Sequence, residues 1–300
     1  MVNKILQALK DPRYTFQYLI HRGNFSNMSD ENYLKMMFKH RVGYELDLNN
    51  PKTFNEKLQW LKLHDKNPSY TQLVDKYEVR KYIAETIGEE YLIPLIGVWN
   101  NFDEIDFSKL PNQFVLKCTH DSGSVFICTD KNEFNIEKAR TKISNALKRN
   151  YYYHDREWPY KNVKPRIICE KFISDNNSVP ADYKVLCFNG KAKLIEMHID
   201  RFGDHKQDFY DEKWNKTQIS QEGTRSDYIS EKPRDFENMI KLSEKLGKNI
   251  NHVRIDWFVT NSKLYFGEIT FFDGSGFYPF DNKEDDYLIG SWIKLPIDKM

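Results

Sequence analysis

One stretch, residues 253–277, constrains this chain more than any other. It reads VRIDWFVTNSKLYFGEITFFDGSGF, in which two β-branched and aromatic runs flank the polar turn TNSK. This pattern predicts an antiparallel β-hairpin. With a three-residue loop at 261–263, Asp256 lies directly opposite Glu268 and Arg254 lies opposite Thr270.

Two carboxylates that face each other across a hairpin repel, so a bound cation is the natural compensation. Oxygen ligands from Asp256 and Glu268, with further oxygens from substrate phosphates, are typical of a Mg²⁺ site in a nucleotide-using protein. The alternative is a solvated hairpin face whose register differs by one residue. Spacing alone leaves both interpretations open.

The length and net charge of the chain narrow the classes of protein that it can belong to. Three hundred residues favour about two domains, and 45 Lys plus Arg against 44 Asp plus Glu give a net charge of +1. This balance removes the usual electrostatic case for nucleic-acid binding. The longest apolar run, YLIPLIGVW at 91–99, contains Pro94 and is too short to span a bilayer. Lys4 and Lys10 interrupt any signal-peptide core, so we expect a cytoplasmic protein without a transmembrane segment.

The four cysteines show no zinc or redox spacing. Each lies in an apolar run, so we expect reduced, buried strand residues at Cys118, Cys128, Cys169 and Cys187.

Residues 1–70 are predicted to be mostly helical. Ser29 with Asn32, and Thr53 with Glu56, are typical of helix starts. Aromatic and apolar residues between 14 and 20, beside basic ones, either pack on another domain, which we favour, or dock peripherally on a membrane surface.

A second candidate site follows a predicted strand that ends at Lys117. The loop after it, DSGS at 121–124, contains small residues whose backbone N–H groups are accessible, an arrangement that holds polyphosphates. It matches neither the P-loop nor the dinucleotide fingerprint, and an ordinary hairpin turn is the alternative.

Two further segments, 151–164 and 200–228, are predicted to be irregular and are rich in Tyr, Trp, Arg and His. In them Arg201, Arg156 and Lys206 are candidates for holding an anionic substrate, the alternative being solvated surface residues. Between these segments, Asn189-Gly190 predicts a tight hairpin.

The order of these elements resembles the ATP-grasp superfamily. More narrowly, FNEKLQWLKLHDKNP, FVLKC, KVLCFNGK and FGEITFFDGSGFYPF are similar to the TupA-like ATP-grasp family, which occurs in bacterial polysaccharide gene sets. The resemblance implies an α+β, ATP-grasp fold, in which two α+β subdomains grip ATP between antiparallel sheets, with a helical N-terminal extension. The implied units are a helical region at 1–70, subdomain A at 71–165 and subdomain B at 166–300.

The resemblance also implies roles for individual residues. ATP phosphates would be bound by Lys76, Lys117, Ser122, Gly123 and Ser124. The hinge that holds adenine would consist of Glu170, Lys171 and Phe172, and ribose or phosphate would contact Asp182 and Lys184. Mg²⁺ would be bound by Asp256, Glu268 and Thr270, the last in place of the family's usual Asn. Arg254 would face the γ-phosphate, so the expected catalytic residues are Arg254, Lys117, Asp256 and Glu268. The second substrate would lie near Arg201, Gly274, Ser275 and Gly276.

The implied function is an ATP-dependent carboxylate–amine ligase that forms an acyl-phosphate and attaches an amino acid to a sugar of a bacterial surface polysaccharide. Such a ligase needs no covalent enzyme nucleophile, and the sequence shows no Ser/His/Asp or Cys/His arrangement. The alternatives are a glycosyltransferase, a sugar kinase or a non-catalytic assembly partner.

Overall fold

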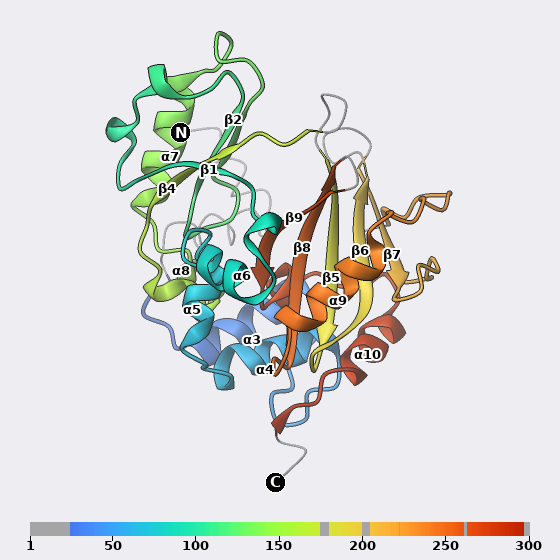
Figure 1. The fold of residues 1–300 in the computed structure, drawn as a ribbon. Helices are drawn as coiled ribbons and strands as arrows, with labels where there is room; N and C mark the ends of the chain where they lie inside the picture. The colour runs from blue at the N-terminus through green and yellow to red at the C-terminus, as the bar shows by residue number, and fades with distance from the viewer. Residues whose placement is uncertain (1–24, 175–179, 200–204, 222, 261–262, 297–300) are drawn as a thin grey trace.

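The computed structural model describes residues 25–174, 180–199, 205–221, 223–260 and 263–296. They form two antiparallel sheets with flanking helices, an α+β architecture (Figure 1). The helices and aromatic cluster predicted within residues 1–24 lie outside the described residues. Of the described helices, none is long and apolar enough to cross a membrane.

Four α-helices precede the first strand in the described chain: α3 (Asp30–Arg41), α4 (Phe54–His64), α5 (Ser69–Val74) and α6 (Val79–Thr86). Both predicted helix starts are confirmed. The Ser29 side chain accepts a bond from the Asn32 backbone N–H, and Thr53 with Glu56 forms a complete capping box. Such caps stabilise a helix by about 1 kcal/mol each. Helix α4 is buried over most of its length because α10 (Lys283–Ser291) and the segment after the last strand pack on it.

The first sheet has the strand order β1-β4-β2-β3. Its strands are β1 (Leu95–Trp99), β2 (Phe114–Cys118), β3 (Val125–Cys128) and β4 (Ile167–Lys171). Helix α7 (Ile136–Leu147) covers one face, where its Ala139 and Ile143 pack with Phe114 and Leu116 in a shared core. The opposite face is left to the cavity described below.

The second sheet has the order β7-β6-β5-β8-β9. Its strands are β5 (Ala181–Phe188), β6 (Lys191–Ile199), β7 (Lys206–Asp211), β8 (His252–Thr260) and β9 (Lys263–Thr270). Helix α9 (Phe236–Leu246) lies across β5, β6 and β8 (Figure 1). Because side chains alternate along a strand, Trp257 points to α9, where its Nε1 donates to Ser243, while Asp256 points to the other face.

Two hairpins in this sheet test the sequence predictions. Asn189 and Gly190 have φ angles of 50° and 78° and join β5 to β6, as predicted. In the hairpin of β8 and β9, Thr260 pairs with Lys263, so the connection has two residues, and the predicted three-residue loop is wrong.

A β-bulge restores the predicted register farther along that hairpin. The pairing shifts between Ile255 and Trp257, so that Arg254 lies opposite Thr270 as predicted. Asp256 lies at the bulge instead of in a one-to-one pair with Glu268. Gly267 permits this close approach, because a Cβ there would lie 3.1 Å from the Asp256 carbonyl oxygen.

Three predictions about segments need correction. Residues 151–164 are not an open loop, because α8 (Tyr152–Asp155) and the 3₁₀ helix η4 (Trp158–Asn162) order them. Arg156 is buried there and donates to the Phe25 carbonyl oxygen, so it is not available to an anionic substrate. The segment 200–228, predicted to be irregular, contains strand β7, whose polar residues concealed it.

Strand β4 pairs with β1 and β2 and lies in the first sheet, although the predicted boundary at 165/166 grouped it with the later strands. The division into three units otherwise remains a prediction. The four cysteines are free and buried, as expected, and lie in β2, β3, β4 and β5.

Candidate functional site

A cavity of about 1990 Å³ is lined by residues of both sheets. From the first sheet it is lined by Val115 and Lys117, and from the second by Lys184, Asp256 and Glu268. Most of the residues expected from the sequence to bind ATP and Mg²⁺ therefore face one space.

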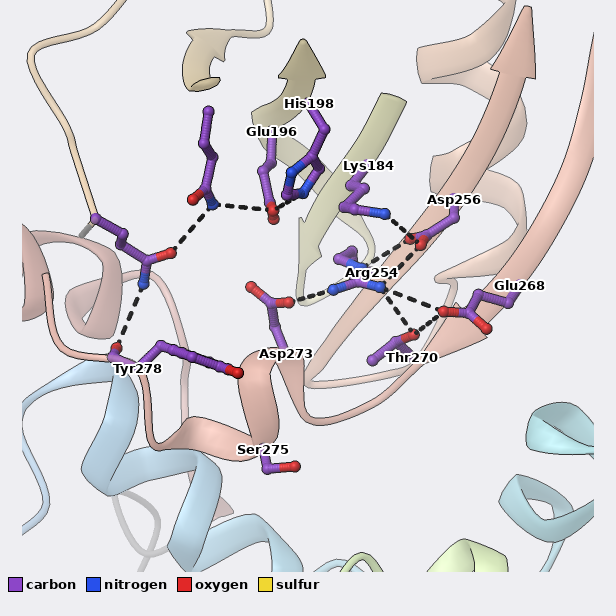
Figure 2. A network of polar contacts seen from close by, with 12 residues as sticks. Lys184, Glu196, His198, Arg254, Asp256, Glu268, Thr270, Asp273, Ser275 and Tyr278 are labelled. Atoms are coloured by element: carbon purple, nitrogen blue, oxygen red, sulfur yellow. Dashed lines mark hydrogen bonds and ion pairs between the residues drawn. The ribbon is translucent and has the colours of Figure 1, made fainter. Parts of the chain in front are cut away.

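Arg254 is the centre of the polar network in this cavity (Figure 2). Its Nε and Nη2 donate to the two oxygens of Asp256 at 2.7 and 2.8 Å. Nη2 also lies 3.4 Å from Glu268 Oε1 and 3.4 Å from Thr270 Oγ1, and Nη1 donates to Asp273. The pairing of β8 with β9 positions four of these five residues, and Asp273 follows in the short helix η5 (Asp273–Gly276).

Lys184 on β5 is the second cation of this network. Its Nζ donates to Asp256 Oδ2 at 2.9 Å and to Asp182 Oδ2 at 2.8 Å. Burial raises the pKa of Asp256, but the charges of Arg254 and Lys184 outweigh burial and lower that pKa to about 2. Burial also raises the pKa of Glu268. The positive charges of Lys76 and Arg254 outweigh burial, so this pKa lies below its ordinary value. Both carboxylates are therefore anionic at neutral pH.

The donor set fits Mg²⁺. Asp256 and Glu268 supply carboxylate oxygens and Thr270 supplies a hydroxyl, all hard ligands of the kind that Mg²⁺ prefers. The Glu268 side chain is 33% exposed, and its contacts with Lys76 and Arg254 are long, at 3.5 and 3.4 Å, so it retains capacity to accept. The described residues contain no group of three or more His, Cys, Asp or Glu side chains arranged to hold a metal. A site with two carboxylates would depend on substrate phosphates and water for its remaining ligands.

The two lysines expected to bind phosphate have carboxylate partners. Lys117 Nζ lies 2.7 Å from Glu170 Oε2, and the other oxygen of Glu170 accepts from Arg80 at 2.9 Å. Lys76 Nζ donates to the Asp121 carbonyl oxygen at 2.8 Å and lies 3.5 Å from Glu268. Glu170, expected at the adenine hinge, lines the cavity together with Lys171 and Phe172, but its carboxylate is occupied by two cations.

The loop at 121–124 is arranged so that its acidic residue is shielded. The Asp121 carboxylate accepts from Ser124 Oγ, and both side chains are buried. Ser122 and Gly123 are exposed and line the cavity, and Gly123 has a φ angle of 90°. Only these two residues of the expected phosphate loop present themselves to a ligand.

The expected substrate end, Gly274 to Gly276, is held against α4. Gln59 Nε2 donates to the carbonyl oxygens of Ser275 and Gly276 at 3.1 and 2.6 Å, and Lys62 Nζ donates to that of Ser275 at 2.7 Å. A Cβ on Gly276 would lie 2.4 Å from Gln59 Nε2. Gln59 and Lys62 position this turn, a role that the sequence did not reveal, because both read as ordinary polar helix residues.

Two of the residues expected to bind ligands remain. Asp182 lines the cavity beside Lys184, whereas Arg201 lies outside the described residues.

Sequence reasoning missed Asp273, Glu196 and His198, which line the same cavity (Figure 2). No usable signal for the last two was present in the sequence. A two-residue turn at Asn189-Gly190 by itself would place Lys184 opposite Ile195, but a β-bulge between Leu186 and Cys187 shifts the pairing so that Lys184 lies opposite Glu196.

The sequence profile of the TupA-like ATP-grasp family matches residues 56–294. The comparison with curated proteins gives no match.

Among solved structures, the D-alanine–D-alanine ligase of Bacillus anthracis, complexed with ATP, is 20% identical, with a TM-score of 0.39 over 67% of this chain and 55% of that one. The L-amino acid ligase of Bacillus licheniformis is 13% identical, with a TM-score of 0.44 over 83% of this chain and 57% of that one. The D-alanine–D-alanine ligase of Helicobacter pylori is 14% identical, with a TM-score of 0.41 over 82% and 70%. The chain spans little more than half the length of the two Bacillus ligases.

The assignment rests on the family profile, which covers most of the chain and includes both sheets and every described residue of the polar network. The chain belongs to the TupA-like ATP-grasp family.

Proposed function

We propose that this protein is an ATP-dependent carboxylate–amine ligase that acts in the cytoplasm. The observation that carries the proposal is the polar network on β8 and β9, where Asp256, Glu268 and Arg254 face one cavity together with Lys76. The two carboxylates can bind a metal ion, and the cationic side chains in the same cavity can bind the phosphates of a nucleoside triphosphate.

The chain's own residues divide the work. Lys76 and Lys117 would neutralise phosphate oxygens, and Ser122 with Gly123 would offer backbone N–H groups. Lys171 and Phe172 would line the adenine end, and Asp182 with Lys184 would contact ribose or phosphate. Asp256, Glu268 and Thr270 would hold Mg²⁺, which when bound neutralises charge on the phosphates and orients them.

Arg254 would stabilise the phosphoryl group as a substrate carboxylate oxygen attacks the γ-phosphorus and ADP leaves. An amine then attacks the carbonyl carbon of the acyl-phosphate, the bond to phosphate breaks, and an amide forms. Positioning and charge stabilisation supply the catalysis, and no enzyme nucleophile is needed.

For the substrates, we propose an amino acid and a uronic-acid or amino-sugar unit of a bacterial surface polysaccharide. The resemblance of the sequence to a family from polysaccharide gene sets supports this choice. The turn at Gly274, Ser275 and Gly276 would end the site near the second substrate.

The test is product analysis. Incubation with ATP, Mg²⁺, labelled amino acids and glycan precursors should give ADP, phosphate and a product heavier by one amino acid less water. UDP release with a gain of one hexose would establish a glycosyltransferase instead, and a gain of one phosphate would establish a sugar kinase.

A further inference from the structure

Strand β6 carries a carboxylate, Glu196, to which the proposed function gives no role. Glu196 pairs with Lys184 on β5, and Lys184 pairs with Asp256 on β8. Residues that pair directly across antiparallel strands point to the same face of the sheet. Glu196 therefore lies in one row with a proposed metal ligand, and it lines the same cavity.

The Glu196 carboxylate is held by one oxygen only. Oε1 bonds to His198 Nε2 at 2.5 Å and accepts from Gln207 Nε2 at 2.9 Å. Oε2 is buried and has no hydrogen-bond partner, and the side chain is only 5% exposed. Buried acceptor atoms almost always have a hydrogen-bond donor, so Oε2 can accept a hydrogen bond from a bound ligand.

Glu196 also lacks a strong cationic partner. The other carboxylates that this sheet presents to the cavity pair with lysine: Asp182 and Asp256 with Lys184, and Glu268 with Lys76. Across the described residues, the ion contact of Glu196 is with His198 alone. Burial raises the pKa of Glu196, but the His198 hydrogen bond and the charge of Arg254 outweigh burial, so the pKa lies below its ordinary value. The group is a buried anion, which favours a cation beside it.

A second acid completes the arrangement. In Figure 2, Glu196 and Asp273 point toward one another beside Arg254. Burial and the negative charge of Glu196 raise the pKa of Asp273, although Arg254 binds one of its oxygens. A positive group placed between these two carboxylates would relieve their repulsion.

We propose that Glu196 and Asp273 form the subsite that binds the amine substrate as its ammonium ion. The inference rests on the proposed ligase function and specifies its nucleophile as a primary amine that is protonated in solution. The bound ammonium gives one proton to a carboxylate of the subsite before its nitrogen attacks the acyl-phosphate. An ammonium group donates three hydrogen bonds, which suits the unpartnered Glu196 Oε2 and the Asp273 carboxylate. His198 and Gln207 are positioning residues that fix the orientation of Glu196 through Oε1.

The experiment compares two reactions of the same active site. Wild-type protein and Glu196→Gln are supplied with ATP, Mg²⁺, the twenty common amino acids, glucuronate, galacturonate, glucosamine and galactosamine, and the coupled pair is identified by mass. The KM for its amine is then measured. In parallel, the amine is replaced by hydroxylamine, which is neutral at pH 7 and traps the activated carboxylate without needing an ammonium subsite.

Glu196→Gln should raise the KM for the amine about 10- to 100-fold, because it removes a charge-assisted hydrogen bond. The rate of hydroxamate formation and the KM for ATP should stay within about 3-fold of wild type. Glu237→Gln, a matched change on the exposed side of α9, should behave as wild type. If Glu196→Gln does not fold, His198→Asn carries the test, with a smaller rise in the same KM and an unchanged hydroxamate rate.

An unchanged KM for the amine would overturn the subsite, and so would a parallel loss of hydroxamate and amide. Absence of both hydroxamate and coupled product with wild-type protein would instead contradict the ligase function on which the inference rests. The two failures are therefore distinguishable.

Discussion

The two proposed metal carboxylates should differ sharply in what they contribute to stability without ligand. Asp256 is 5% exposed and accepts from Arg254 at 2.7 and 2.8 Å and from Lys184 at 2.9 Å. Without this carboxylate charge, the positive charges of Arg254 and Lys184 are less well neutralised inside the protein. Breaking a buried ion pair in this way costs about 3–5 kcal/mol of stability. The lowering of the Asp256 pKa from 3.8 to about 2 agrees in sign, because the folded protein favours the charged carboxylate. That stabilisation is present above the unfolded-state pKa and is lost as pH falls through about 2.

Glu268 is one-third exposed, and its ion contacts are 3.4 and 3.5 Å long. Such a pair contributes at most about 1 kcal/mol to the free energy of unfolding. Asp256→Asn should therefore destabilise the ligand-free protein by about 3 kcal/mol or more, while Glu268→Gln stays within about 1 kcal/mol of wild type.

The assay is urea unfolding at pH 7.5, with and without Mg·ATP. At ATP about 100 times its Kd, wild-type protein should gain about 2.7 kcal/mol, and both variants should lose most of that gain. Wild-type stability in ligand-free Asp256→Asn would refute the energetic reasoning, and a full ATP response in Glu268→Gln would refute its role as a metal ligand.

Three further perturbations probe neighbouring parts of the site and core. Lys117→Met should leave the fold intact, because Glu170 keeps Arg80 at 2.9 Å, but should weaken ATP binding in a calorimetric titration; unchanged binding would count against this lysine. Arg254→Ala should lower kcat about 100-fold or more with a smaller change in the KM for ATP, and a loss explained by ATP binding alone would contradict its role at the phosphoryl group. His252 is buried against Phe54, and burial lowers its pKa from 6.5 to about 4. Because the unfolded chain binds the proton first, up to about 3 kcal/mol of stability should be lost as pH falls from 6.5 to 4. His252→Phe should flatten the dependence of the free energy of unfolding on pH. A pH profile that is the same as that of wild type would contradict this role of His252.

Local signals in the sequence were sufficient for several elements. The capping box at Thr53 and Glu56 and the turn at Asn189-Gly190 formed as expected, since both depend on residues close in sequence. The hairpin of β8 and β9 was predicted with Arg254 opposite Thr270. Its two-residue connection and bulge were not, because register depends on which strand face the core buries.

Contacts between segments that are distant along the chain could not be predicted from the sequence. Lys117 was expected to meet phosphate, yet its partner in the fold is Glu170, 53 positions away on β4. Glu196 and Asp273 drew no attention, because single acidic residues on a strand and in a turn are ordinary. Only the folded sheet shows that one is buried with an unpartnered oxygen and that the other points toward it.

Isotope transfer from a labelled substrate tests the central claim most directly. Once the coupled pair is known, its carboxylate is labelled with ¹⁸O, and the phosphate released with ATP and Mg²⁺ is analysed by mass spectrometry. A carboxylate oxygen that attacks the γ-phosphorus leaves with that phosphate, so the account predicts one ¹⁸O in each phosphate released per amide formed. Unlabelled phosphate from a reaction that still yields the amide would contradict activation through an acyl-phosphate.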